Sequence, residues 1–243
     1  MIAGGWVPVL RGRSDAGLRH PGTRDVDVLF NDDRETIRNA VQLFLASGFV
    51  LSAKHEFQLL KALSVGSRKF VFNIDLMHPA EAFTQPEMFQ DIMDLGIRSD
   101  YDEMKPKVKS ICFRSSAIIF QQNLWSRVKV AATNFSGKHS ECYVPLMDES
   151  ALILSKADSV KQDKRARDAF DIYFLLSGPE GQKIAKKLKS LSASFPQVSM
   201  QLEHLHKFLK EHSNQFDKNV ANYFTHKSVA VEPSRYVREL LFS

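Results

Sequence analysis

Two aspartates stand two residues apart in a short apolar run near the start of the sequence. Asp25 and Asp27 alternate with Val26 and Val28 in residues 23–30. In a strand, this spacing places both carboxylates on one face and the valines on the other. Neighbouring carboxylates repel each other, so a fold seldom gathers them without a cation or a proton to share. Such oxygen ligands suit Mg²⁺, which typically takes one or two carboxylates together with substrate phosphates.

A third carboxylate and a pair of glycines extend this group. Residues 69–77 alternate between apolar and polar types, which predicts a strand and gives Asp75 a setting like that of the first two aspartates. Three carboxylates can bind two Mg²⁺ ions roughly 3.5–4 Å apart, which clamps the attacking and leaving oxygens of phosphoryl transfer. Gly4 and Gly5 lack side chains, so their backbone can approach a triphosphate. The alternative is a solvated strand face with a simple turn at the glycines.

A second group of chemical residues lies around a basic turn between two expected helices. Lys156 precedes this turn, and Asp168 and Asp171 follow it. A lysine ammonium is a point charge that can bind a triphosphate. The two aspartates are three residues apart on one helical face, and Asp168 can either orient Lys156 or accept a proton from an attacking hydroxyl. The alternative is a helix cap with exposed ion pairs to Lys164, Arg165 and Arg167.

The elements that must position these residues change character after residue 148. Before it, the patterns predict a short strand broken by glycines in 1–10, a polar loop over 11–23, and helices over 31–47, capped by Asp32 or Asp33, and 86–95. Strands are expected at 24–30, 49–53, 57–65, 69–77, 107–113, 117–122, 127–133 and 142–146. After residue 148, helices are expected at 149–161, 166–177, 180–192, 198–212, 215–224 and 233–242.

Together these elements predict an α/β (α+β) fold with a mixed sheet. The expected domains are a core over residues 1–147 and a helical C-terminal subdomain over 148–243, whose Lys156 and Asp168 helices pack on the core. A chain of 243 residues can form one large domain or two small ones.

Composition indicates a cytoplasmic protein without a membrane partner. Apolar residues make up 44% and charged residues 25% of the chain, as in ordinary globular proteins. The apolar runs fall short of the ~20 residues of a membrane span, and the first residues lack the pattern of a signal peptide. Two cysteines, Cys112 and Cys142, give no disulfide framework, so a reducing compartment is expected.

The net charge of +5 arises entirely in the last third of the chain. Residues 1–160 carry 19 basic and 19 acidic side chains, whereas residues 161–243 carry 14 basic and 9 acidic ones. A basic surface on a neutral body can steer a polyanion toward the protein. The alternative is a set of solvated helix faces.

The first group of residues resembles the nucleotidyltransferase superfamily that shares the polymerase-β core. That superfamily has a glycine pair, an Asp-apolar-Asp-apolar strand and a third acid on a neighbouring strand. Gly4-Gly5, residues 25–28 and Asp75 match these in order, although the loop between the glycines and Asp25 is longer than usual. The second group is similar to the signature of the AbiEii/AbiGii toxin branch, which has a helix lysine, a basic turn and Arg-Asp-x-x-Asp. In this branch the metal motif has the form Thr-x-Asp-x-Asp, which here begins at Thr23.

This resemblance implies a Mg²⁺-dependent transfer of a nucleoside monophosphate from an NTP to an acceptor hydroxyl, with release of pyrophosphate. The implied metal ligands of a two-metal site are Asp25, Asp27 and Asp75, and the last also helps to activate the acceptor. The implied NTP-binding residues are Gly4, Gly5, Thr23 and Lys156, with Asp168 supporting the lysine. Members of the family serve as toxins of toxin–antitoxin or phage-defence systems, and some modify tRNA, which implies an RNA acceptor and an antitoxin partner.

Two other functions are compatible with the same residues. An enzyme of identical chemistry can modify a small molecule, as antibiotic nucleotidyltransferases do. Alternatively, the chain can keep the fold as a non-catalytic binding module. A basic groove would favour RNA, and a closed pocket would favour a small acceptor.

Overall fold

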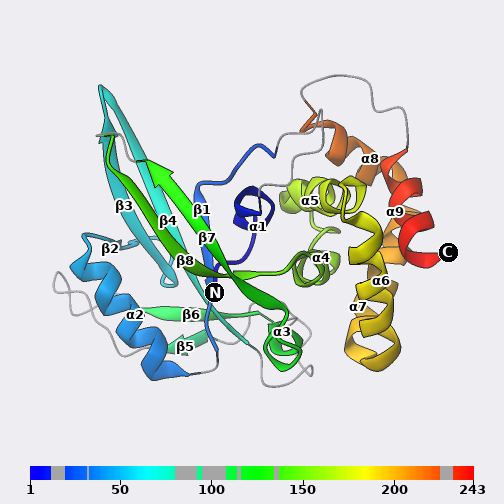
Figure 1. Cartoon of the computed structure of the whole chain (residues 1–243), viewed down its shortest axis with the longest axis horizontal. Helices are drawn as coiled ribbons and strands as arrows, with labels where there is room; N and C mark the ends of the chain where they lie inside the picture. The colour runs from blue at the N-terminus through cyan, green and yellow to red at the C-terminus, as the bar shows by residue number, and fades with distance from the viewer. Residues whose placement is uncertain are drawn as a thin grey trace. The chain divides into compact units, whose positions relative to one another are not determined.

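A computed structural model describes residues 1–11, 20–31, 33–79, 92–94, 108–113, 116–133, 137–224 and 232–243. It divides into two compact units (Figure 1). The first consists of Met1–Trp6 with Thr23–Met147, and the second of Val7–Gly22 with Asp148–Ser243. The division after Met147 falls at the expected residue, whereas Val7–Gly22 belongs with the helices instead of the expected N-terminal core. Arg11 explains part of this difference, because its Nε lies 3.5 Å from Glu149 Oε2 in the second unit.

The first unit is built on a mixed sheet, as the sequence predicts. Its strands are β1 (Asp25–Leu29), β2 (Val50–Leu51), β3 (Gln58–Val65), β4 (Arg68–Pro79), β5 (Ile92–Asp94) and β6 (Lys109–Phe113). They are arranged in the order β2-β3-β4-β6-β5, with β1 also paired to β4. The long β4 is antiparallel to β3 and parallel to both β1 and β6.

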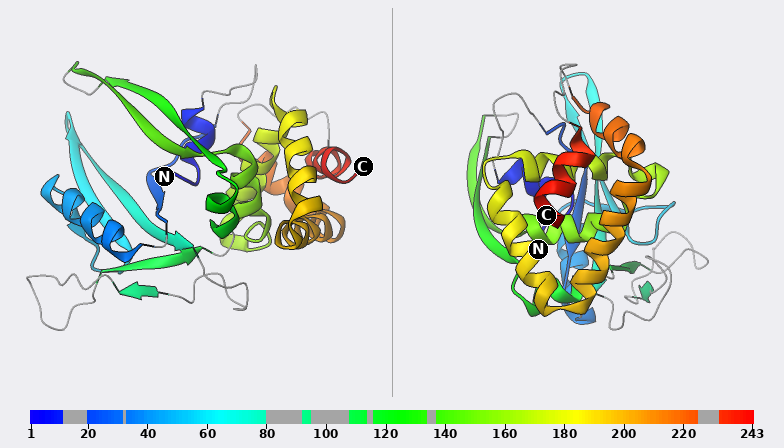
Figure 2. Two further views of the ribbon diagram at one scale, coloured as in Figure 1. Left: turned by 60° about the horizontal axis from the view of Figure 1, so that its bottom comes forward. Right: turned by 90° about the vertical axis from the view of Figure 1, so that its right-hand side faces the viewer.

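Helix α2 (Arg34–Ala46) covers one face of this sheet (Figure 2). The carboxylate of Asp33 caps the helix by accepting a hydrogen bond from the Glu35 backbone N–H, as expected for one of the two predicted caps. Ile37 and Val41 lie fully buried on its inner face. They join a core cluster with Leu59, Ile74, Leu76 and Val108, against which Val26 and Val28 pack. The valines that alternate with the aspartates of β1 therefore face α2.

A separate two-stranded ribbon completes the first unit. It consists of β7 (Trp125–Thr133) and β8 (His139–Met147), which pair antiparallel along their whole length and follow α3 (Ser116–Gln121). Ile2 links this ribbon to the sheet, because it forms one bridge with Val28 and another with Leu146. The ribbon lies on the side of the sheet away from α2 (Figure 2).

Three local predictions for residues 1–147 are wrong. Residues 1–10 contain an isolated bridge at Ile2 and the helix α1 (Trp6–Leu10) instead of a broken strand. Residues 117–121 lie in α3 and Gln122 follows it, because a short apolar run does not distinguish a buried helix from a strand. The helix expected over 86–95 contains the strand β5, and the rest of that range lies outside the described residues.

The second unit is helical, as predicted. Its helices are α4 (Glu149–Ala157), α5 (Ala166–Ser177), α6 (Gly181–Ser194), α7 (Pro196–Glu211), α8 (Ser213–Ala221) and α9 (Pro233–Phe242), with a short 3₁₀ turn at Asp163–Arg165. Helix α4 ends four residues earlier than predicted. Helix α5 is buried from Asp168 to Leu176 and forms the centre of the unit. In the described residues, no helix has the length and apolar character needed to cross a membrane.

Candidate functional site

The three aspartates of the first group share one face of the sheet. Strands β1 and β4 run parallel in a register that sets Asp27 opposite Asp75 and Asp25 opposite Asn73. Paired residues on neighbouring strands project to the same side, and alternate residues of one strand do so too. The aspartates therefore lie on the face away from α2, and we call Asp25, Asp27 and Asp75 the acid face. The predicted sharing of one face is confirmed.

Two neutral amides hold Asp75 in place on this face. The side-chain nitrogen of Gln58, which is paired with Asp75 across β3 and β4, donates to Asp75 Oδ1 at 2.8 Å. The side-chain nitrogen of Asn73 donates to the same oxygen at 3.4 Å. Burial raises the pKa of Asp75 and the charge of Asp25 raises it further, while the two amide hydrogen bonds act in the opposite direction. On balance, the charged form of Asp75 is disfavoured at this position.

The predicted glycine pair is packed directly against this face. Gly4 has a φ of +62°, in the left-handed region that favours glycine, and a Cβ built there would lie 1.7 Å from Asp27 Oδ2. The neighbouring Ala3 backbone N–H donates to the Asp27 carbonyl oxygen at 2.9 Å. Gly5 follows in the same turn, immediately before α1. Only a residue without a side chain fits at Gly4 while Asp27 keeps its position.

Thr23 shapes the start of the strand that carries two of the aspartates. Its hydroxyl oxygen accepts a hydrogen bond from the Asp25 backbone N–H at 3.3 Å. This bond satisfies a donor at the beginning of β1 and orients the chain as it reaches Asp25. Thr23 therefore acts on the acid face through the backbone.

The donor types of the acid face fit Mg²⁺, but the side chains do not form a finished site. Carboxylates on adjacent strands are the oxygen ligands that Mg²⁺ accepts. Nevertheless, no three His, Cys, Asp or Glu side chains of the described residues come together as a group that could hold a metal. The predicted metal site therefore stays a prediction.

The second group of residues forms a buried ion cluster inside the helical unit. Lys156 is only 6% exposed, and its Nζ lies 2.6 Å from Asp168 Oδ1 and 2.7 Å from Asp171 Oδ2. The alternative reading of exposed ion pairs around the basic turn is wrong for these residues. Although burial lowers the pKa of Lys156, the charges of Asp171 and Asp168 outweigh that effect and raise it. The ammonium group of Lys156 forms ion pairs with both carboxylates.

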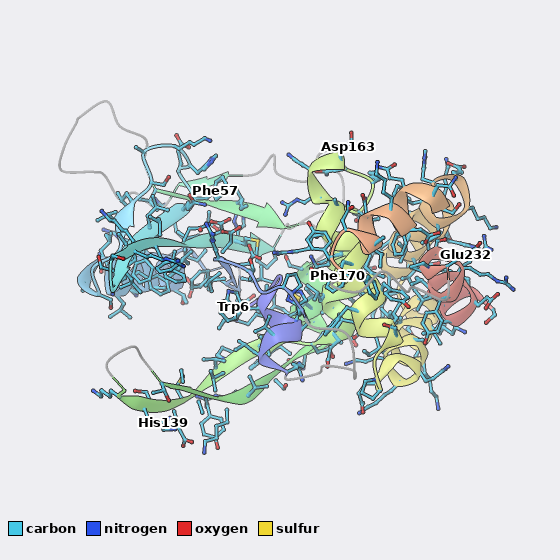
Figure 3. The ribbon with its side chains drawn as sticks, turned by 90° about the horizontal axis from the view of Figure 1, so that it is seen from above. Trp6, Phe57, His139, Asp163, Phe170 and Glu232 are labelled. Atoms are coloured by element: carbon cyan, nitrogen blue, oxygen red, sulfur yellow. The ribbon has the colours of Figure 1, made fainter. Side chains whose placement is uncertain are left out.

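A histidine that sequence reasoning missed belongs to this cluster. His20 Nε2 lies 2.9 Å from Asp171 Oδ1, and its Nδ1 accepts a hydrogen bond from the Gly22 backbone N–H at 3.1 Å. A ring nitrogen that accepts carries no proton, so Nε2 carries the proton and donates to the carboxylate. The ring packs against Phe170 and Phe174, with centroids 5.8 and 5.6 Å away. Phe170 is labelled within the helical unit in Figure 3.

Two more side chains complete the ion cluster. The Ser159 hydroxyl donates to Asp168 Oδ2 at 2.5 Å. The Arg167 Nε lies 3.8 Å from Asp171 Oδ2, while its Nη1 donates to the Gly22 carbonyl oxygen at 3.3 Å. Asp171 is fully buried, which acts to raise its pKa, but the charge of Lys156 and the hydrogen bond from His20 lower the pKa to about 2. We call Lys156, Asp168, Asp171, His20, Ser159 and Arg167 the ion cluster.

The predicted site residues therefore fall into two groups. Gly4, Gly5, Thr23, Asp25, Asp27 and Asp75 belong to the first unit, and Lys156 and Asp168 belong to the second. Comparisons with known proteins do not extend this assignment, since no family model, no curated protein and no solved structure matches the chain. The resemblance to AbiEii-type nucleotidyltransferases consequently rests on the sequence motifs alone.

Proposed function

We propose that this protein is a Mg²⁺-dependent nucleotidyltransferase with a polymerase-β-like core, which transfers a nucleoside monophosphate from an NTP to an acceptor hydroxyl. The observation that carries the proposal is the register of β1 and β4. It sets Asp27 opposite Asp75 with Asp25 on the same face, and Gly4 packs against Asp27. A turn without side chains beside three carboxylates supports the binding of a metal-bound triphosphate.

In this proposal the residues of the acid face divide the work. Asp25 and Asp27 hold the metal, and Mg²⁺ supplies charge stabilisation at the phosphoryl group when it is bound. The acceptor oxygen forms a bond to the α-phosphorus while the bond to pyrophosphate breaks, and the acceptor proton passes to Asp75. The position of Asp75 suits a general base, because it lies opposite Asp27 on the face that would hold the metal. Gln58 keeps the Asp75 carboxylate in one orientation.

The ion cluster supports a different role for Lys156 from a simple phosphate contact. Its ammonium already has two carboxylate partners, so binding a phosphate would require it to exchange one of them. In our proposal the backbone at Gly4-Gly5 contacts the triphosphate. Lys156 and Asp168 act mainly by joining α4 to α5.

The proposed acceptor is RNA, and the proposed setting is a cytoplasmic toxin paired with an antitoxin protein. This part rests on the resemblance of the motifs and on the basic last third of the chain, which carries the whole net charge of +5. A small-molecule acceptor and a non-catalytic binding module are the competing functions. They differ from the proposal in what becomes labelled when the protein meets an NTP.

A labelling experiment separates these functions. The protein is incubated with Mg²⁺, total RNA and each of the four NTPs labelled at the α-phosphate. We expect label in an RNA band, and none with Asp27→Asn. Asp163→Asn is the matched control, because this aspartate lies in the turn before α5, outside the acid face. Label confined to a small molecule would favour the antibiotic-type enzyme, and no label with any NTP would contradict catalysis.

A further inference from the structure

The β7–β8 ribbon presents two different faces. Its register pairs Lys129 with Tyr143 and Arg127 with Pro145, so these four residues lie on one face together with Glu141 and His139. The opposite face carries small and apolar residues, namely Ser126, Val128, Val130, Ala132, Ser140, Cys142, Val144 and Leu146. We call the first of these the charged face of the ribbon. His139, labelled in Figure 3, marks its outer end.

The charged face combines an exposed aromatic ring with cationic side chains. Tyr143 is 62% exposed, more than any other aromatic side chain that the structure describes. Lys129 stands directly across from Tyr143. Arg127 lies two residues before Lys129 on β7, about 6.8 Å away along that strand. Lys129 Nζ pairs with Glu141 Oε2 at 2.7 Å, but both side chains are about half exposed. Exposed pairs of this kind contribute little, so the lysine can exchange its partner for a phosphate.

We propose that the charged face of the ribbon binds single-stranded RNA, with a base stacked on Tyr143 and the backbone phosphates near Arg127 and Lys129. Aromatic rings flanked by cations are how proteins hold single strands, because every base has a face for stacking and every nucleotide has a phosphate. A duplex hides its base faces, so it cannot use the tyrosine. The choice of RNA rests on the proposed function, since RNA is its proposed acceptor.

The ribbon belongs to the same unit as the acid face. Its strand β8 is joined to β1 through Ile2, whose backbone N–H donates to the Pro145 carbonyl oxygen and whose carbonyl accepts from the Met147 backbone N–H. The ribbon also lies on the side of the sheet away from α2, which is the side of the acid face (Figure 2). A strand held on the ribbon is therefore held by the unit that carries the proposed metal ligands.

A binding experiment without NTP or metal tests this inference. Fluorescence anisotropy of a labelled 12-nucleotide single-stranded RNA is measured in EDTA at several salt concentrations. We expect Tyr143→Ala to weaken binding about five-fold or more, and Tyr143→Phe to bind like the parent, because a phenyl ring still stacks. Arg127→Ala with Lys129→Ala should reduce the log–log salt slope by about 1.4, since each lost contact on a single strand removes roughly 0.7.

Matched controls come from exposed residues elsewhere. Leu43→Ala removes an apolar side chain that is 69% exposed, and Lys183→Ala breaks an exposed ion pair with Glu180. Neither should change RNA binding. Circular dichroism melting checks that each ribbon variant remains folded.

Several outcomes would overturn the inference. Parent-like affinity of Tyr143→Ala, or equally tight binding of a duplex of the same sequence, would remove the role of stacking. Loss of binding in a variant with Lys161, Lys164 and Arg165 all changed to Ala, with the ribbon variants unaffected, would place the RNA on the helical unit. Tyr143-dependent binding by a protein that transfers no nucleotide would leave this inference intact and contradict the proposed function alone.

Discussion

The acid face and the ion cluster both gather aspartates, but they stabilise them in opposite ways. On the acid face, Asp75 is held by the neutral amides of Gln58 and Asn73 and lies near the charge of Asp25. In the ion cluster, Asp171 is fully buried, but it meets the charge of Lys156 and a hydrogen bond from His20. The pKa of Asp75 is raised, whereas the pKa of Asp171 is lowered.

This difference separates a group of carboxylates that can bind a ligand from a buried cluster whose charges are already paired. A carboxylate whose pKa is raised by burial and by a like charge, as that of Asp75 is, gains from a bound cation, whereas the ammonium of Lys156 already has two carboxylate partners. We therefore regard the acid face as the binding site and the ion cluster as the feature that holds the helical unit together.

Breaking the ion cluster should cost the most stability. Lys156→Ala leaves Asp168 and Asp171 buried together without their shared cation, and removing one partner of a buried pair typically costs about 3–5 kcal/mol. We expect a loss of this size in the free energy of unfolding in urea. Lys183→Ala, in an exposed pair, should cost less than about 1 kcal/mol. An equally small loss for Lys156→Ala would show that the cluster is not structural.

The acid face should show the reverse pattern, with large effects on activity and small ones on stability. Asp27→Asn removes a carboxylate from the acid face but keeps the size of the side chain, so the protein should remain folded, with a melting temperature close to that of the parent. Nucleotide transfer should decrease more than about 100-fold, the upper range seen when hydrogen-bond partners of metal ligands are removed. Steady-state transfer rates and thermal melts, measured side by side, provide the check. Retained transfer would contradict the role of Asp27.

Acid should weaken the ion cluster through Asp171. Because its pKa is about 2 in the folded protein against an ordinary 3.8, its charged form contributes stability above pH 3.8 that is lost as pH falls toward 2. The shift corresponds to about 2 kcal/mol. Asp75 changes the stability in the opposite direction, because a group with a raised pKa stabilises the folded state at low pH. Between pH 5 and pH 2, the free energy of unfolding should therefore fall less steeply for Asp171→Asn than for the parent. An unchanged slope would contradict this assignment.

The smallest expected effect concerns the glycine turn. Gly4→Ala places a methyl group against Asp27 and also forces a left-handed residue, which costs about 1–2 kcal/mol on its own. Gly66→Ala is a matched control, because Gly66 has a φ of +57° and open space around it. Both variants should lose similar stability from the backbone, but only Gly4→Ala should also lose transfer activity. Equal activity in the two would separate Gly4 from the site.

The sequence was sufficient to predict the acid face because strand parity is a local property. Alternation within 24–30 and 69–77 determines which side chains share a face, and the observed register of β1 and β4 agrees with it. The positions of the helices after residue 148 were predictable for a similar reason, because their apolar residues recur with helical spacing. The side-chain positions of the three aspartates were not predictable, because they depend on partners such as Gln58 that pair across strands.

The ion cluster could not be found from local patterns in the same way. His20 and Asp171 are 151 residues apart, and no spacing rule connects a loop histidine to a distant helix. The burial of Lys156 did leave a signal, because α4 and α5 are apolar almost all round, as buried helices are. The basic turn at Lys164 and Arg165 concealed that signal by suggesting an exposed surface.

Titration with Mg²⁺, followed through the side-chain carboxyl ¹³C signals of aspartate, tests the central claim most directly. In the absence of nucleotide, we predict that Mg²⁺ shifts the signals of Asp25, Asp27 and Asp75 and leaves those of Asp168 and Asp171 unchanged. Asp27→Asn should abolish the shifts at the other two residues of the acid face. Shifts confined to Asp168 and Asp171, or no shift on the acid face at any Mg²⁺ concentration, would contradict the account.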